Sequence, residues 1–170
     1  MSDAIERLKA LGILVPEILL PRKDVDLFRW AVIACDQHTS NREYWRRVAE
    51  TAGDHPSSVN LVLPEVYLEE GDLDSRVESI RRSMEEYLDS GVLQPHGPLA
   101  VYTERFPRVQ HPRRGLVVAV DLERYDFAPG SRTLIRATEE TILSRLPVRE
   151  RIREGAPLEG ADVEVTGDMT

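Results

Sequence analysis

The segment from Asp74 to Gly91 restricts the fold more than any other part of the chain. Its apolar residues recur at intervals of three, four or one positions, and they are Val77, Ile80, Met84, Tyr87 and Leu88. This spacing places them on one face of an α-helix, with Asp72 or Asp74 as the start signal and Gly91 as the stop signal. Because such a face must be covered, the sequence predicts a globular fold with an apolar core.

Two further segments with helical features lie on either side of this one. Residues 41–52 follow Ser40 and Glu43, whose spacing fits a capping box that opens a helix. Residues 138–146 are predicted to form another helix, which Pro147 is expected to end. The helices at 41–52 and at 74–90 are expected to pack on a sheet through their apolar faces.

Short apolar runs predict strands at residues 30–35, 59–64, 99–103 and 115–120. The last two runs are separated by the Pro- and Arg-rich linker 107–114, so we expect them to form an antiparallel pair. Strands and helices do not alternate regularly along the chain. The predicted fold class is therefore α+β, with a mixed, partly antiparallel sheet flanked by helices.

The length of 170 residues is typical of one domain. We expect a single α+β domain over residues 1–160. The polar residues 161–170 are expected to form a tail or a truncated continuation of the chain. An exposed edge strand in a truncated sheet would favour pairing between copies, so a homodimer is expected.

The composition excludes some classes of partner. A net charge of −8 argues against nucleic acid, because phosphate binding needs a dense basic surface. No window approaches the ~20 apolar residues of a membrane span. The single cysteine, Cys35, fits a reducing compartment, so the expected location is cytoplasmic.

The first candidate site is the polar stretch that follows the apolar run 30–35. It consists of Asp36, Gln37, His38, Thr39 and Ser40. A polar turn before a helix N-terminus can bind an anion, because backbone N–H groups and the helix dipole favour negative charge. It can equally be a turn in which Ser40 caps the helix and Asp36 fixes the backbone. Both interpretations are open from the sequence.

A run of arginines supplies the second candidate site. Of the 22 Lys and Arg residues, only Lys9 and Lys23 are lysines. Arg132 and Arg136 flank three residues, and in an extended segment positions four apart point to the same side. Two guanidinium groups there would suit a phosphate or a carboxylate. The alternative is a solvated face of ion pairs, which the neighbouring glutamates and the further arginines 145, 149, 151 and 153 would also form.

Glu65 is the candidate general base, because it follows the apolar run 59–64 directly. The alternative is an exposed carboxylate at the entrance to the next helix. Cys35 and His38 have the spacing of two metal ligands, but a zinc site needs three or four, so no metal site is predicted. The sequence identifies no cofactor.

Several blocks of the sequence resemble those of one known family, in the same order over about residues 13–160. These blocks are Trp30–Ser40, Glu43–Trp45, Asn60–Leu68, Tyr87–Leu88, Gly91–Leu93, Arg114–Val117, Asp121–Asp126, Ser131–Glu139 and Arg153–Glu159. They resemble the N-terminal part of the bacterial and archaeal domain-of-unknown-function family 1015 (DUF1015).

The resemblance carries expectations of its own. Members of the family are typically longer and carry an Asp-Gly-His-His-Arg segment further along the chain. That segment is similar to one in the chromosome-partitioning and sulfiredoxin-like fold, whose members include nucleotide-using enzymes such as free-serine kinases. The resemblance therefore implies binding of a nucleotide or phosphate by a full-length relative, and transfer of phosphoryl groups. The present sequence contains no Asp-Gly-His-His-Arg segment.

Two functions are expected from these observations. The first is a non-catalytic or incomplete N-terminal domain of a longer protein of unknown function, acting in binding or assembly. The second is a small cytoplasmic, phosphotransferase-like enzyme for a nucleotide or phosphorylated metabolite. In the second, Asp36 and Glu65 are the candidate catalytic residues. The candidate ligand-binding residues are Gln37, His38, Thr39, Ser40, Arg132 and Arg136. Whether the chain is an enzyme is left open by the sequence.

Overall fold

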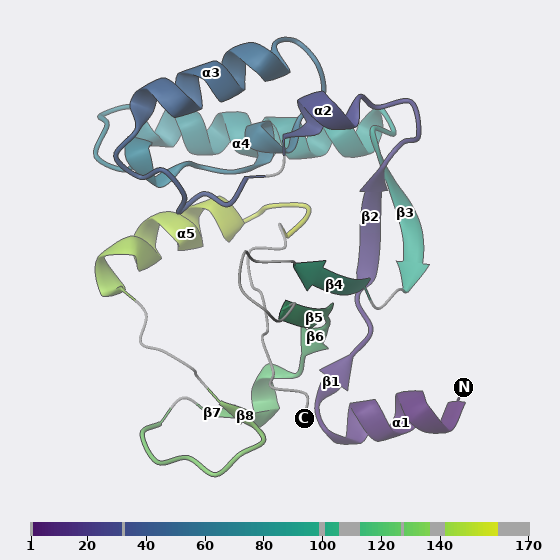
Figure 1. The fold of residues 1–170 in the computed structure, drawn as a ribbon. Helices are drawn as coiled ribbons and strands as arrows, with labels where there is room; N and C mark the ends of the chain where they lie inside the picture. The colour runs from purple at the N-terminus through teal and green to yellow at the C-terminus, as the bar shows by residue number, and fades with distance from the viewer. Residues whose placement is uncertain are drawn as a thin grey trace. The chain divides into compact units, whose positions relative to one another are not determined.

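The computed structural model describes residues 2–31, 33–98, 101–105, 113–126, 128–136 and 142–159 (Figure 1). The chain divides into two compact units, which are described separately below. The first unit comprises Met1–Ile18 and Pro95–Thr141, and the second comprises Leu19–Gln94 and Ile142–Asp162. Helices occur together with antiparallel and parallel strand pairs, so the predicted mixed α+β class is confirmed. The predicted single domain over residues 1–160 stays a prediction.

The second unit is mainly helical. It contains α2 (Leu27–Trp30), α3 (Arg42–Ala52), α4 (Leu73–Asp89) and α5 (Leu146–Arg153). The short 3-10 turn η1 (Ser58–Leu61) contacts both α3 and α4, and α5 contacts α4. The predicted helix at 74–90 is confirmed with bounds shifted by one residue.

The core of the second unit is organised by α4. Its residue Tyr87 packs with Trp30 and with Val92 and Leu93, which follow the helix. Ile80 and Met84, which precede Tyr87 on the same helix, pack with Leu63 in a second cluster. Apolar residues of α5 pack against this second cluster. The apolar face that the sequence pattern identified is therefore the face that is buried.

The predicted strand at 30–35 is wrong among the described residues of that run. Trp30 ends α2, and Ala31 has a left-handed backbone with a φ of 43°. The carbonyl oxygens of these two residues accept hydrogen bonds from the hydroxyls of Ser57 (3.1 Å) and Ser58 (2.8 Å). Side-chain hydroxyls thus satisfy carbonyls that a neighbouring strand would otherwise bind.

The predicted strand at 59–64 is also wrong, because η1 covers its first half and no strand is formed over the second half. Ser57 is fully buried and caps η1 through its hydroxyl, which accepts from the amide of Val59. The amide of Ser57 itself donates to the hydroxyl of Tyr87 at 2.9 Å. A short apolar run does not by itself distinguish a strand from a buried turn. Here the hydrogen bonds of Ser57 and Tyr87 stabilise the turn.

Two predicted helix boundaries are corrected. The N-cap of α3 is Asn41, whose side chain accepts from the amide of Tyr44 at 2.9 Å, and not Ser40. Pro147 stands at the second position of α5 and does not end a helix. Proline is tolerated in the first turn because the amide it lacks has no partner there in any helix. Residues 138–141 of the predicted helix lie outside the described residues.

The first unit contains α1 (Ser2–Ala10) and short strand pairs. Strand β1 (Ile13–Leu14) pairs antiparallel with β6 (Ala119–Val120), and β7 (Tyr125–Asp126) pairs parallel with β8 (Ile135–Arg136). Gly12 precedes β1 with a φ of +83°, and an added Cβ there would lie 2.8 Å from Cδ of Arg124. A glycine is thus required where the chain passes the Arg124 side chain.

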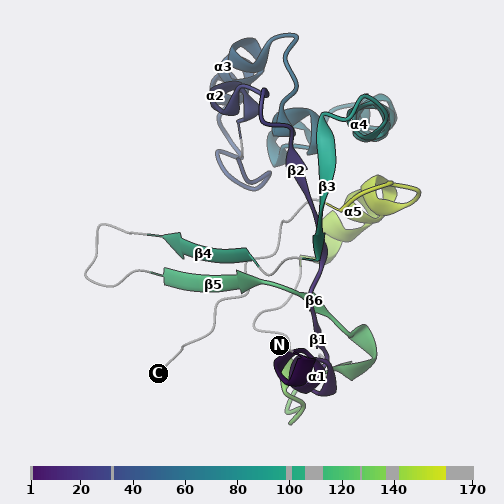
Figure 2. The same cartoon turned by 90° about the vertical axis from the view of Figure 1, so that its right-hand side faces the viewer.

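The predicted antiparallel pair at 99–103 and 115–120 is confirmed for the described residues. Strand β4 (Val101–Arg105) pairs antiparallel with β5 (Arg113–Val117), and the two arrows lie side by side in Figure 2. Strands β2 (Glu17–Pro21) and β3 (Leu93–Pro98) form a further pair. Within the described parts of the chain, each of the four sheets has two strands. None of the described helices has the length and apolar character needed to cross a membrane.

Candidate functional site

The predicted polar turn at residues 35–40 lies in the second unit and is fixed by hydrogen bonds to its backbone. The amide of Glu65 donates to the carbonyl of Cys35 at 2.9 Å. Nε1 of Trp45, a buried residue of α3, donates to the carbonyl of Gln37 at 3.2 Å. The amide of Asn41 donates to the carbonyl of His38 at 2.9 Å. The turn therefore has a defined backbone although it lies on the surface.

The side chains of Asp36, Gln37, His38, Thr39 and Ser40 are all exposed. The backbone of His38 is left-handed, with a φ of 51°. Its ring stacks on Tyr44 in the first turn of α3, with ring centroids 3.8 Å apart. Because Asn41 caps α3, the hydroxyl of Ser40 is not used as the cap. The structure thus places five polar side chains on a fixed turn that leads into a helix.

The charge of Glu43, in the first turn of α3, is balanced by an arginine of the same helix. Arg46 donates to both carboxylate oxygens of Glu43, at 2.6 and 3.0 Å. This hydrogen bonding lowers the pKa of Glu43 and raises the pKa of Arg46. Glu43 is therefore held ionised by Arg46 and does not complete the capping box that the sequence suggested.

Glu65 joins two parts of the second unit that are distant in sequence. It begins the 3-10 turn η2 (Glu65–Tyr67), and its amide binds the Cys35 carbonyl. Its side chain is only 7% exposed, and its Oε1 lies 3.5 Å from Nη2 of Arg149 on α5, whose side chain is 48% exposed. The predicted general base is thus a nearly buried carboxylate held against a guanidinium.

A cluster that the sequence did not reveal lies next to Glu65. The guanidinium of Arg76 stacks over the ring of Tyr67, 4.4 Å from its centroid, and that of Arg42 lies 6.0 Å from the same centroid. Both arginines also pair with Glu70, and Arg76 bonds Asp72 at 3.0 Å. The cluster ties the first residue of α3 to α4 through η2. Spacing could not have found it, because its members come from three separate segments.

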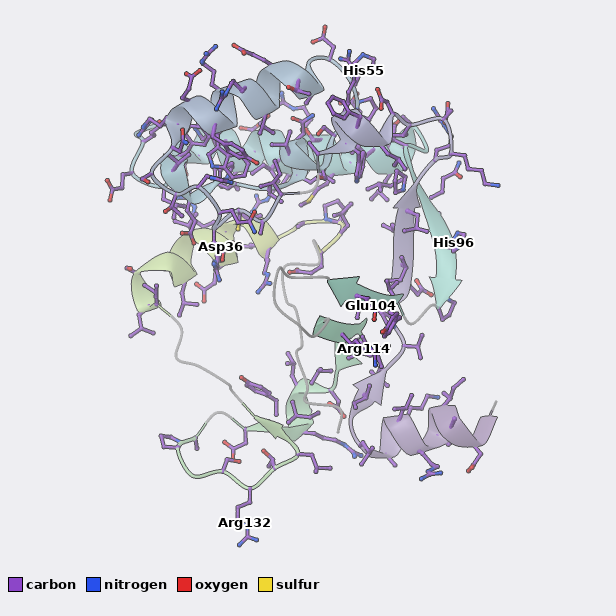
Figure 3. All side chains as sticks on the ribbon, viewed as in Figure 1. Asp36, His55, His96, Glu104, Arg114 and Arg132 are labelled. Atoms are coloured by element: carbon purple, nitrogen blue, oxygen red, sulfur yellow. The ribbon has the colours of Figure 1, made fainter. Side chains whose placement is uncertain are left out.

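Arg132 and Arg136 belong to the first unit. Arg132 is exposed, and Figure 3 shows its side chain directed away from the loop that joins β7 and β8. The segment between the two arginines is not one extended strand. Thr133 lies in a bend, and its hydroxyl bonds the hydroxyl of Ser131 at 3.0 Å and the carbonyl of Ile135 at 2.9 Å. The side chain of Arg136 lies outside the described residues.

The structure therefore groups the turn with Glu65 in one unit and the two arginines in the other. A site that combines all of them stays a prediction. The guanidinium next to Glu65 is that of Arg149, a pairing that the sequence does not predict. Among the residues that the structure describes, no group of three or more His, Cys, Asp or Glu side chains is arranged to hold a metal ion.

One family model matches the chain. It carries the description "Protein of unknown function (DUF1015)" and matches residues 17–166. This is the family that the sequence blocks resemble. No curated protein and no solved structure matches the chain.

Proposed function

We propose that this chain, which belongs to the DUF1015 family of proteins of unknown function, is a non-catalytic binding module for an anionic small molecule. The proposed site comprises the turn 36–40 and the guanidinium of Arg149. The observation that carries the proposal is the position of Glu65, whose amide holds the turn and whose carboxylate holds Arg149. A single nearly buried side chain and its backbone amide thus contact both Arg149 and the polar turn.

The turn supports this proposal through its rigidity. Three hydrogen bonds from Glu65, Trp45 and Asn41 fix the carbonyls of the turn. A preorganised site loses little conformational entropy on binding, so its polar groups contribute more to affinity. The hydroxyls of Thr39 and Ser40, which lie on the surface just before α3, are donors of the kind that a phosphate or carboxylate accepts.

Arg149 supports the choice of an anion. Its side chain is about half exposed, and its ion pair with Glu65 involves Nη2. A guanidinium has five N–H donors in a planar fork, so donors remain for a second acceptor. The carboxylate of Glu65 fixes the direction in which this fork points. The buried member of the pair therefore orients the exposed member.

A second candidate function is a phosphotransferase-like enzyme in which Glu65 is the general base and Asp36 assists. One observation favours it, because a nearly buried carboxylate beside a polar surface turn is a common setting for proton transfer. The ion pair with Arg149 favours the binding module instead, since the carboxylate is already engaged. Catalysis would require ligand binding to release Glu65 from Arg149.

The proposal is tested by thermal shift and calorimetry with inorganic phosphate, ATP and phosphoserine as probes. A ligand that binds only the folded state adds about 2.7 kcal/mol of stability at a hundredfold excess over Kd. We expect stabilisation by at least one probe, with a tenfold or greater loss of affinity in Arg149→Met. The matched control is Arg82→Met, an exposed arginine of α4 in the same unit. Equal affinities in the two variants, or no response to any probe, would refute the proposed site.

The two candidate functions are separated by turnover. The binding module predicts no consumption of ATP above the rate of the buffer alone, with phosphoserine or free serine as the second substrate. Steady consumption that is abolished in Glu65→Gln would establish the enzyme instead. Binding is measured on the same samples, so that loss of ligand and loss of chemistry are distinguished.

We also propose that the chain works in the cytoplasm. The support is its single cysteine, Cys35, which has no second cysteine for an internal disulfide. Fractionation of source cells with an antibody to the chain tests this, and recovery from an extracellular fraction would contradict it.

A further inference from the structure

The antiparallel ribbon of β4 and β5 has one covered face and one exposed face. Val101, Gly115 and Val117 are partly buried, whereas their neighbours on the other face are exposed. This is the alternation expected of a strand pair with one side towards the protein. Figure 2 shows the two strands as a two-stranded ribbon.

The exposed face combines an apolar pair with an ion pair. Tyr102 lies directly opposite Leu116, and their exposures are 51% and 46%. Two residues later on β4 and two residues earlier on β5, Glu104 lies opposite Arg114, with Oε1 and Nε 3.1 Å apart. Figure 3 shows these two charged side chains next to each other. One face thus carries two large apolar side chains, one acid and one base.

A two-stranded ribbon of this kind is poorly stabilised by itself. Isolated hairpins are marginal in water, and exposed edges and apolar cross-strand pairs favour contact with another chain. Tyrosine and arginine are also among the residue types that contribute strongly to protein interfaces. The composition of the exposed face therefore fits a contact surface better than a solvated one.

We propose that the exposed face of the β4–β5 ribbon binds the same face of a second copy of this chain. The charges select this partner, because a face with one acid and one base is complementary to itself. A two-fold axis between two stacked ribbons, parallel to the strands, places Tyr102 against the partner's Leu116. The same axis places Glu104 against the partner's Arg114. Each copy thus repeats the cross-strand pairing that its own ribbon makes, as an isologous interface requires.

The exposed face carries only two of the five cross-strand pairs of the ribbon, so the interface is small and the dimer is a weak one whose population depends on concentration. The first test is sedimentation equilibrium of the full chain over a wide concentration series. We expect a monomer–dimer equilibrium that is weakened at least tenfold by Leu116→Glu. The matched control is Leu122→Glu, because Leu122 belongs to the same unit and is 76% exposed. The control is expected to associate like the wild type.

The second test exchanges the charges. Glu104→Arg gives a face with two positive charges, and Arg114→Glu gives one with two negative charges, so each variant alone is expected to be more monomeric. An equimolar mixture of the two is expected to form mixed dimers at least as readily as the wild type forms its own. A damaged fold cannot produce this recovery.

Three results would overturn the proposal. One is a wild-type chain that remains monomeric at every concentration. Another is a control, Leu122→Glu, that dissociates as readily as Leu116→Glu. The third is a mixture of the two charge variants that stays monomeric.

Discussion

The hydroxyl of Tyr87 is the best place to test the account of the helical unit, and the change is Tyr87→Phe. This hydroxyl accepts from the amide of Ser57 and from Nδ2 of Asn60, both at 2.9 Å. Ser57 is fully buried and Tyr87 is buried beside Trp30. Phenylalanine keeps the ring and its packing, so the variant removes the hydrogen bonds alone.

The expected loss of stability depends on how deeply each of the two donors is buried once its acceptor is removed. The buried amide of Ser57 loses its partner, which costs about 1–3 kcal/mol. The side-chain amide of Asn60 is only partly buried, so the loss of its hydrogen bond adds about 0.5–1 kcal/mol. We expect a total loss of about 1.5–4 kcal/mol in the free energy of unfolding. With a urea m-value of about 2 kcal/mol/M, the midpoint falls by roughly 0.8–2 M.

Urea unfolding followed by tryptophan fluorescence measures this loss directly. Both tryptophans of the chain, Trp30 and Trp45, lie in the second unit, so the signal reports on that unit. Tyr102→Phe is the control, because Tyr102 is exposed in the first unit, and its midpoint is expected to be unchanged. A loss below about 0.5 kcal/mol in Tyr87→Phe would refute the role given to the hydroxyl.

Two further predictions concern the first unit. Gly12→Ala places a side chain on a backbone with a φ of +83° and against Arg124, so we expect the free energy of unfolding to fall by about 1–3 kcal/mol. We also expect faster hydrogen exchange of the Asp121 amide, because it donates to the Gly12 carbonyl. Gly71→Ala is the control and is expected to change neither quantity, because Gly71 has open space around it and no positive φ. The pKa of Asp126 is lowered mainly by a hydrogen bond from the backbone amide of Ala128. The ionised carboxylate therefore stabilises the fold fully above about pH 4, the ordinary pKa of an aspartate, and this stabilisation is lost as the pH falls through the lower pKa of the folded state. An NMR titration of the Asp126 carboxyl checks this, and a pKa at or above that of an ordinary aspartate would contradict it.

The elements that the sequence predicted well are those whose signals are local. Helix α4 was found because its apolar residues repeat at helical spacing, and the β4–β5 pair because two runs flank a linker. The prediction of a strand at 30–35 is wrong because a short apolar run has no period that separates a strand from a turn. Its structure depends on Ser57 and Ser58, whose hydroxyls bind carbonyls 27 positions earlier. No local pattern contains that information.

The candidate site shows the same division. The turn 36–40 was identified from an abrupt change from apolar to polar residues, and the structure confirms a surface turn there. The partner of Glu65 was not identified, because Arg149 lies 84 positions away in sequence. The arginine run that contains it was visible, but only the fold shows which member lies beside the carboxylate. An ion pair between segments that are distant in sequence can be identified only from the tertiary structure.

The proposed anion site in the second unit is tested by an NMR titration of the amide resonances with inorganic phosphate and with ATP. If the turn 36–40 and Arg149 form this site, the largest shift changes occur at residues 36–40 and at Arg149, and Arg149→Met abolishes them. Shift changes centred on Arg132 and Arg136, or absent from the turn, would contradict it.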